Sequence, residues 1–254
     1  MTMRIHIITL FPDLFPGPLG ASITGRAITQ GTFEIIPHDL RQYGTGNHQT
    51  VDDSPYGGGP GMLFKPEPLT YAIENVQEGL TSPMEDVPVI LLTPQGRTFN
   101  QNRADQLAEC SEIILICGRY EGVDERVREN LISEEISVGD FVVTGGEIPA
   151  MLIVDAIMRK VPGVLGSEES SIVESHAENL LEGPQYTRPA NFRGWKIPEI
   201  LLSGNHQEIT RWRRNQALLR TALRRPDLIN EANLTDDEKA WLKEKLSAQN
   251  FENE

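Results

Sequence analysis

The chain has 254 residues, of which 39% are hydrophobic and 24% are charged, and its formal net charge at pH 7 is −14. This length suits one large domain or a medium domain with a small one, and the composition argues against global disorder. No apolar run approaches the roughly 18 residues of a membrane span, so we expect none. We expect Cys110 and Cys117 to be reduced thiols, as in a cytoplasmic protein.

Strand-like and helix-like segments alternate from the amino terminus to about Lys160. The strand-like segments are 4–10, 33–37, 87–93, 112–117 and 136–143, and the helix-like segments are 19–30, 66–78, 100–109, 123–133 and 148–160. The first strand-like segment is too short to be the apolar region of a signal peptide. The alternation predicts an α/β fold in which helices cover both faces of a mostly parallel sheet.

The composition changes after residue 162. Residues 163–173 are mostly small and polar, as in a linker, and Glu174, Glu178 and Glu182 follow at helical spacing. The rest of the chain is predicted to be helical. Residues 203–205, Ser-Gly-Asn, can cap a helix whose apolar face carries Ile209, Trp212, Leu219 and Leu223, and Thr235 to Glu238 form a capping box. We therefore expect domains at 1–162 and 174–254.

Glycine-containing turns follow three of the predicted strands, at residues 93–97, 117–126 and 138–147. Ligands bind at the carboxyl ends of strands in open α/β sheets, and glycine lets the main chain approach a ligand closely. Such turns also occur as purely structural connections. No phosphate-binding loop or dinucleotide motif follows a strand, so a pocket here favours adenosine without phosphates over a nucleotide.

Three further segments have both a functional and a structural interpretation. Residues 188–225 contain nine Lys or Arg and two acids, a net charge of +7, which indicates a polyanion site or a solvated helical face. The loop at 51–62 holds Gly57, Gly58 and Gly59, and it is either a contact for a planar base or a surface connection. Carboxylates at 174–182 offer a general base or a solvated acidic face. The five histidines lack metal-ligand spacing, so we expect no histidine-bound metal.

Together these segments resemble the bacterial tRNA (guanine-N1)-methyltransferase family, the TrmD type of the SPOUT class. The matching segments are 7–12, 55–62, 93–97, 117–126, 139–147, 162–166, 183–189 and 202–213, in the same order along nearly the whole chain. The resemblance implies an α/β domain ending in a trefoil knot, which binds S-adenosyl-L-methionine (AdoMet), and a small helical domain that binds the tRNA anticodon arm. It also implies a homodimer with shared active sites, and methylation of the guanine 3′ of the anticodon, position 37. Magnesium is associated with the family's reaction.

The resemblance also implies roles for individual residues. The AdoMet pocket would comprise Thr93, Pro94, Gly118, Tyr120, Glu121, Val138, Gly139, Asp140, Phe141, Val142, Val143, Gly145 and Gly146. Glu174 matches the family's general base and Arg159 its catalytic arginine. Contacts with tRNA would involve Gly58, Gly59, Glu182, Arg188, Ser203, Asn205, Arg211 and Arg214. The family usually has aspartate at positions 174 and 182, and many members have tyrosine at Leu91.

Two other interpretations stay open at this point. One is a SPOUT-type RNA methyltransferase with a different target nucleotide. The other is a catalytically weakened RNA-binding protein that keeps AdoMet as a structural ligand, which the departures at Glu174, Glu182 and Leu91 would allow.

Overall fold

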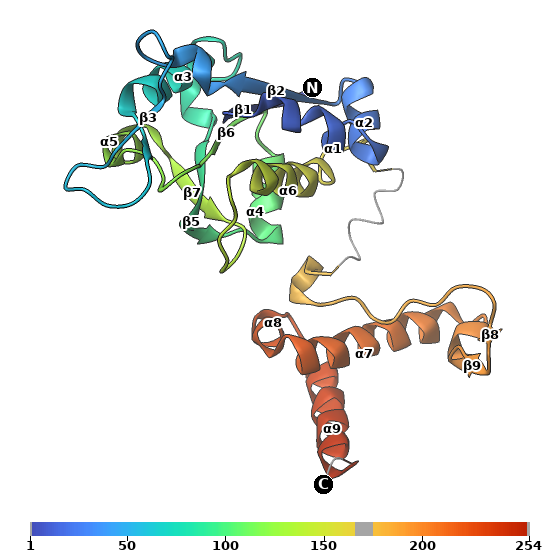
Figure 1. The fold of residues 1–254 in the computed structure, drawn as a ribbon. Coiled ribbons are helices and arrows are strands. Elements are labelled where there is room, and N and C mark those ends of the chain that lie inside the picture. Colours follow the sequence, from blue (N-terminus) through green and yellow to red (C-terminus); the bar gives the residue numbers. More distant parts are fainter. Residues whose placement is uncertain (1, 166–174, 253–254) are drawn as a thin grey trace. The chain divides into compact units, whose positions relative to one another are not determined.

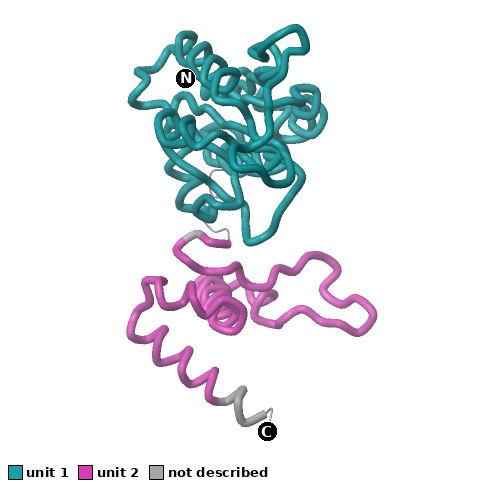
Figure 2. Tube along the Cα trace, turned by 60° about the vertical axis from the view of Figure 1, so that its left-hand side comes forward, with its two compact units in different colours: residues 1–168 teal, residues 169–254 magenta. Residues whose placement is uncertain are grey.

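The computed structural model describes residues 2–165 and 175–252, and the chain divides into two compact units, Met1–Glu168 and Glu169–Glu254 (Figure 2). Most of the predicted linker, together with Glu174, lies outside the described residues. No helix in the described ranges is both long and apolar enough to cross a membrane.

Unit 1 is a mixed α/β domain. Its strands are β1 (Met3–Thr9), β2 (Phe33–Asp39), β3 (Asp52–Asp53), β4 (Leu63–Phe64), β5 (Val89–Thr98), β6 (Glu112–Cys117) and β7 (Glu134–Ser137). Its helices are α1 (Pro16–Leu19), α2 (Ser22–Thr29), α3 (Pro66–Glu78), α4 (Gln101–Ala108), α5 (Glu125–Leu131) and α6 (Glu147–Met158), with short 3₁₀ helices at Pro12–Leu14, Leu40–Tyr43 and Met84–Asp86. Five strands form a parallel sheet in the order β2-β1-β6-β5-β7, which confirms the predicted sheet.

Helices cover both faces of this sheet. Alternate side chains of a strand point to opposite faces, so one strand contributes side chains to two buried clusters. Ile113 and Leu115 of β6 pack into one buried cluster, with residues from α1, α2, α4 and α6. Ile114 and Ile116 pack into a second cluster, with residues from α3 and α5. β6 is buried along its whole length, which explains its continuous apolar sequence. Figure 1 labels these helices around the sheet.

A buried carboxylate at the start of β6 belongs to a polar network in this core. The Glu112 carboxylate lies 2.8 Å from the Arg4 guanidinium and accepts hydrogen bonds from the main-chain N–H groups of Thr81 (3.0 Å) and Ser82 (2.6 Å). Burial raises the pKa of Glu112, but the hydrogen bonds from Ser82 and Thr81 outweigh it and lower the pKa to about 2. Glu112 therefore stays charged inside the fold.

Two predicted elements of unit 1 were wrong in extent. The strand predicted at 136–143 ends at Ser137, whose hydroxyl donates to the Gly139 carbonyl while Gly139 adopts φ +148°. The chain leaves the sheet there, so Phe141 and Val142 are exposed instead of buried. The helix predicted at 19–30 is interrupted between α1 and α2.

Unit 2 contains the 3₁₀ helices Ala177–Asn179 and Glu199–Leu202, the strands β8 (Asn191–Phe192) and β9 (Trp195–Lys196), and the helices α7 (His206–Arg224), α8 (Pro226–Glu231) and α9 (Asp236–Glu252). Its small core is built on Leu180, Leu218 and Leu242. The Asn205 side chain accepts from the Glu208 N–H and caps α7, as predicted. Thr235 and Glu238 form the predicted reciprocal capping box.

Two predictions for unit 2 were wrong and a third was right only in part. The unit is not all-helical, because it contains the β8–β9 hairpin. Glu178 and Glu182 do not share an α-helix, because Glu178 adopts φ +53° inside a single 3₁₀ turn and the chain is irregular beyond it. The predicted apolar face of α7 is right at Leu219, which packs against the core beside Leu218, but Leu223 on that face is exposed.

Candidate functional site

A cavity of about 240 Å³ lies beside the middle of β5 and the carboxyl ends of β6 and β7. The three glycine-containing turns expected from the sequence line it together. The expected residues that line it are Thr93, Pro94, Gly118, Tyr120, Glu121, Val138, Phe141, Val142, Val143, Gly145 and Gly146, whereas Gly139 and Asp140 do not. The sequence-based assignment missed Gln95, Arg119, Arg128, Thr144 and Pro149, which also line the cavity, as does Leu91.

The first wall of the cavity is an excursion of β5. Leu92 and Arg97 both pair with Ile136 of β7, so the four residues between them, 93–96, leave the ladder and return to it. This excursion places Thr93 and Pro94 at the rim. The strand and the binding turn are therefore one continuous element.

The other two walls are the turns that follow β6 and β7, and they contact each other at Gly118 and Gly146. The Gly146 N–H donates to the Gly118 carbonyl at 2.8 Å. A Cβ atom on Gly146 would lie 2.6 Å from the Cys117 Cα, and one on Gly118 would lie 2.6 Å from the Leu92 carbonyl oxygen. Both clashes are with the main chain, so only glycine fits at these two positions.

A buried ion pair holds these walls in place. Glu147, at the first position of α6, is 1% exposed and lies 2.9 Å from the guanidinium of Arg119. It also accepts from the Thr9 hydroxyl at 2.9 Å, while Arg119 donates to the Thr144 carbonyl and stands over the Phe11 ring. Burial raises the pKa of the neighbouring Cys117 thiol well above its usual value, and the Glu147 carboxylate adds to this, so the thiol stays protonated. The pair fixes the β6 turn against α6.

The glycine-rich loop at 51–62 returns to the rim of the cavity. Gly57, Gly58 and Gly59 all have positive φ, and open space surrounds the positions of Cβ atoms on Gly57 and Gly58. The Glu121 N–H donates to the Met62 carbonyl at 2.9 Å, and Tyr120 packs edge-on against Phe64. The loop is thus exposed at its tip and fixed beside the cavity at its end.

Of the two expected catalytic residues, Arg159 lies in the described part of the chain, and it does not line this cavity. Arg159 is half-buried at the carboxyl end of α6, whereas the cavity lies at the amino end. The 12 residues of α6 separate these ends by about 18 Å, at 1.5 Å per residue. Glu174 lies outside the described residues.

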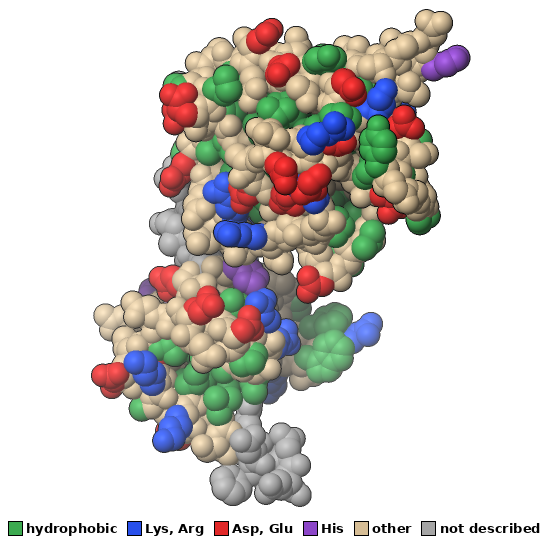
Figure 3. Space-filling view, turned by 90° about the vertical axis from the view of Figure 1, so that its left-hand side faces the viewer, with side chains coloured by type: hydrophobic (Ala, Val, Ile, Leu, Met, Phe, Trp, Pro, Cys, Tyr) green, Lys and Arg blue, Asp and Glu red, His purple; other side chains and the backbone are tan. Residues whose placement is uncertain are grey.

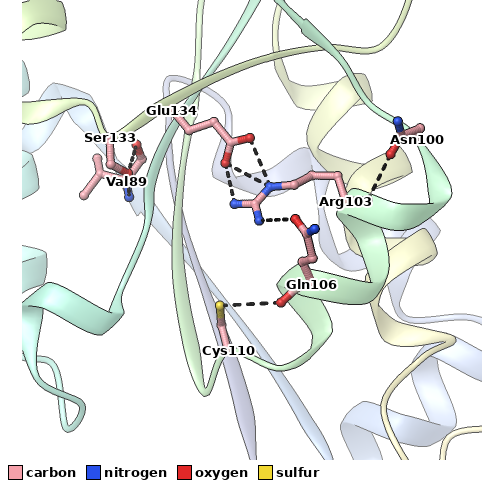
Figure 4. Close-up of polar contacts among 7 residues, drawn as sticks. All are labelled: Val89, Asn100, Arg103, Gln106, Cys110, Ser133 and Glu134. Atoms are coloured by element: carbon pink, nitrogen blue, oxygen red, sulfur yellow. Dashed lines mark hydrogen bonds and ion pairs between the residues drawn. The ribbon is translucent and has the colours of Figure 1, made fainter.

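A larger hollow of about 840 Å³ borders the β5–β7 edge, and three of its four charged lining side chains, Arg103, Glu134 and Glu135, form ion pairs. Arg103 donates to both carboxylate oxygens of Glu134 through its Nε and Nη2 atoms, and its Nη1 donates to the Gln106 side chain (Figure 4). Arg128 similarly pairs with Glu135 at 3.1 Å. The hollow therefore offers no unpaired charge among these residues to a ligand.

The residues expected to contact tRNA in unit 2 divide into two groups. In the first group, the Ser203 hydroxyl donates to the Ile200 carbonyl and the Asn205 side chain accepts from the Glu208 N–H. Arg214 pairs with Glu178 (2.9 Å) and Glu238 (2.8 Å). These carboxylates raise the pKa of Arg214. Glu182 is half-buried, and its carbonyl accepts from Arg220. Arg188 and Arg211 are exposed and form no ion pair within the described part of the chain.

A family model described as tRNA (Guanine-1)-methyltransferase TrmD matches residues 3–231. A tRNA (guanine-N(1)-)-methyltransferase of Dehalococcoides mccartyi is 52% identical over 248 residues, which cover 98% of this chain and 99% of that protein. The enzymes of the same name from Geobacillus kaustophilus and Geotalea uraniireducens are 53% and 54% identical over 242 residues, 95% of this chain and 98% and 96% of theirs.

Proposed function

The chain belongs to the TrmD family of tRNA (guanine-1)-methyltransferases, and we propose that it transfers a methyl group from AdoMet to N1 of the guanine 3′ of the anticodon, position 37, in tRNA. The observation that carries this proposal is identity above 50% over nearly the full length of enzymes with that activity in their name. The SPOUT trefoil knot in residues 1–162 and a tRNA-binding helical domain in 174–254 are parts of the same proposal.

The cavity beside the middle of β5 and the carboxyl ends of β6 and β7 suits AdoMet. Glycine-containing turns present main-chain N–H and C=O groups to an adenosine, while Leu91 and Val138 add apolar contact. The cavity has no phosphate-binding loop, which matches a ligand without phosphates. When bound, AdoMet supplies a methyl group on a sulfonium, so the protein mainly has to align donor and acceptor.

The acceptor nitrogen sets the requirement for a base. N1 of guanine carries a proton, which must be removed before or during transfer, and we assign this step to the Glu174 carboxylate. Negative charge then develops on guanine O6, and Arg159 is assigned to stabilise it. The Glu174→Gln variant should bind AdoMet normally and lose methyl transfer at neutral pH. A variant that retains its transfer rate would remove Glu174 from this role.

Two copies of the chain would complete the site. Arg159 and the cavity lie at opposite ends of α6, about 18 Å apart along it. Exposed apolar side chains, Phe141 and Val142 on the turn and Ile148 and Leu152 on α6, offer a surface for a second copy to cover. We therefore assign the active form to a homodimer in which Arg159 of one chain serves the cavity of the other.

Mixing two impaired variants tests this sharing. An Arg159→Met chain and a chain with Gly146→Ala, which disturbs the cavity, should each lose most of their methyl transfer when assayed alone. Mixed dimers should regain transfer, because one of their two sites combines an intact cavity with an intact Arg159. If the mixture stays impaired although mixed dimers form, each chain builds its own site.

Magnesium is not assigned to any described residue. Within residues 2–165 and 175–252, no group of three His, Cys, Asp or Glu lies together as a candidate ion site. The cytoplasm is the proposed location, because Cys110 and Cys117 are free thiols and the substrate is tRNA.

The reaction is tested with labelled AdoMet and two transcripts of one tRNA. One transcript has guanine immediately 3′ of the anticodon and the other has adenine there. We expect label in the first transcript only. Equal labelling of both would point to a SPOUT-type enzyme with another target nucleotide, and no labelling with retained tRNA binding to an RNA-binding protein.

A further inference from the structure

Strands β8 and β9 form a short hairpin with an aromatic pair beside its turn. Phe192 and Trp195 face each other across the ladder, with ring centroids 5.8 Å apart at 63°. Arg193 (φ +56°) and Gly194 (φ +87°) make the tight turn, which the Asn191 side chain supports by accepting from the Gly194 N–H at 3.0 Å. The hairpin thus holds two large rings in a fixed arrangement. In Figure 1 it lies at the opposite end of α7 from α8.

The rings of Phe192 and Trp195 are exposed, and the packing of the unit 2 core does not include them. Phe192 is 51% exposed and Trp195 is 70% exposed, and neither belongs to the hydrophobic cluster built on Leu180, Leu218 and Leu242. Figure 3 shows a group of hydrophobic side chains at one edge of unit 2, with a Lys or Arg side chain beside it. An exposed aromatic patch with a polar margin is typical of a binding surface.

The surroundings of the rings are positively charged. The 16 residues between Glu182 and Glu199 include Arg188, Arg193 and Lys196 and no acid. The Arg193 guanidinium stands 5.2 Å from the centre of the Phe192 ring. None of these three basic side chains forms an ion pair with another described residue. Their charge is therefore available to an anionic partner.

A hollow lies at the base of the hairpin. It measures about 520 Å³, and Tyr186, Arg188, Ile197, Leu202 and Arg213 are among the residues that line it. Tyr186 is half exposed and contacts Trp212, with ring centroids 6.4 Å apart. Aromatic, aliphatic and arginine side chains thus line a depression next to the aromatic hairpin.

From this geometry we propose that the hairpin is a stacking platform for an unpaired base of the tRNA anticodon loop, distinct from the guanine that is methylated. Phe192 and Trp195 provide the stacking faces, and Arg188, Arg193 and Lys196 contact the flanking phosphates. Proteins bind single-stranded nucleic acid by this combination of aromatic faces and basic side chains. The proposal rests on the proposed function, because it takes tRNA as the substrate.

The charge on the hairpin selects RNA over other occupants. A protein partner of ordinary composition would leave three unpaired cations unexplained, whereas the phosphates of RNA match them. An anionic membrane surface would match the charge as well, so it is included as an outcome of the test.

The test compares the full-length protein with a Phe192→Ala, Trp195→Ala double variant. The probe is a labelled RNA transcript of the anticodon stem and loop. The comparison RNA is a fully paired duplex with the same stem sequence, which has no unpaired bases. Tyr71→Ala is the matched control, because Tyr71 is an equally exposed aromatic residue of unit 1 outside the cavity and the hairpin. Dissociation constants come from fluorescence anisotropy, and circular dichroism checks the folding of each variant.

We expect the double variant to bind the stem-loop roughly 5- to 100-fold more weakly, with unchanged binding of the duplex and of AdoMet. A Trp195→Phe variant should restore most of the affinity, because phenylalanine keeps a stacking face. Equal affinity of double variant and wild type for the stem-loop would overturn the proposal, and so would an equal loss on the duplex. Binding to phosphatidylglycerol vesicles that depends on the two rings, with unaltered RNA affinity, would assign the hairpin to membranes instead.

The two proposals fail separately. If the wild-type protein binds the stem-loop through the hairpin but does not methylate guanine transcripts, the platform stands and the enzymatic function falls. If methylation occurs and the double variant keeps the wild-type KM for tRNA, the platform falls alone.

Discussion

Substituting Gly146 by alanine tests whether contact between two turns shapes the cavity that we propose for AdoMet. Gly146 has φ −75° and ψ −6°, a conformation that alanine adopts freely, so backbone strain does not contribute. The added Cβ would lie 2.6 Å from the Cys117 Cα and 2.8 Å from the Gly118 nitrogen, whereas ordinary contacts begin at 3.4 Å. The turns must therefore separate by 3.4 − 2.6 = 0.8 Å, and main-chain atoms cannot yield by rotating a side chain. Overpacking of this kind costs about 1–3 kcal/mol of stability.

The expected result for Gly146→Ala is a folded protein with weaker AdoMet binding. Because a misplacement near 1 Å costs about 100-fold in rate, methyl transfer should fall by about that factor. Isothermal titration with AdoMet and a labelled methyl-transfer assay measure the two effects. The control is Gly79→Ala at the end of α3, where φ is −91° and the nearest atom to the added Cβ is 3.5 Å away. AdoMet affinity within twofold of wild type in Gly146→Ala would refute the reasoning.

Three further predictions concern stability and are measured by urea denaturation. The Glu112→Gln variant should lose about 3 kcal/mol at pH 7, because the folded pKa of about 2 lies well below the usual pKa of 4.5 for a glutamate. This loss should shrink as the pH falls from 4.5 to 2, where Glu112 itself becomes protonated, and a loss independent of pH would contradict it. Arg119→Met should cost about 3–5 kcal/mol, since it strands the buried Glu147 carboxylate; the control Arg126→Met, which breaks an exposed pair with Asp124, should leave stability nearly unchanged. Thr235→Ala should cost about 1 kcal/mol in unit 2 by removing one half of the capping box, and an unchanged transition there would argue against its role.

The sheet of unit 1 was predictable because its physical signals are local. Runs such as 112–117 are apolar at every position, which occurs when helices cover both faces of a parallel strand. The end of β7 was missed because Phe141 and Val142 continue the apolar pattern beyond Gly139. Exposed apolar residues of that kind have no local signature that separates them from a core strand. The inward face of α7 depends on packing against α8 and α9, which periodicity alone does not determine.

The site was predictable in its turns and less so in its partners. Glycines after three strands indicated where the cavity would form, and the resemblance identified most of its lining. The ion pair of Arg119 with Glu147 joins residues 28 positions apart, and no spacing rule connects them. Phe192 and Trp195 were missed although the sequence carries a local signal for the turn between them. Two aromatic residues flanking Arg-Gly are a hairpin signal, but only the structure shows both rings exposed.

The excursion of β5 at residues 93–96 has a consequence for the energetics of ligand capture. Since Leu92 and Arg97 are both held by Ile136, the segment between them is closed at its two ends before any ligand arrives. Its conformational entropy is lost when the chain folds, so docking a ligand against Thr93 and Pro94 requires little additional ordering. This wall of the cavity is preorganised by the sheet itself.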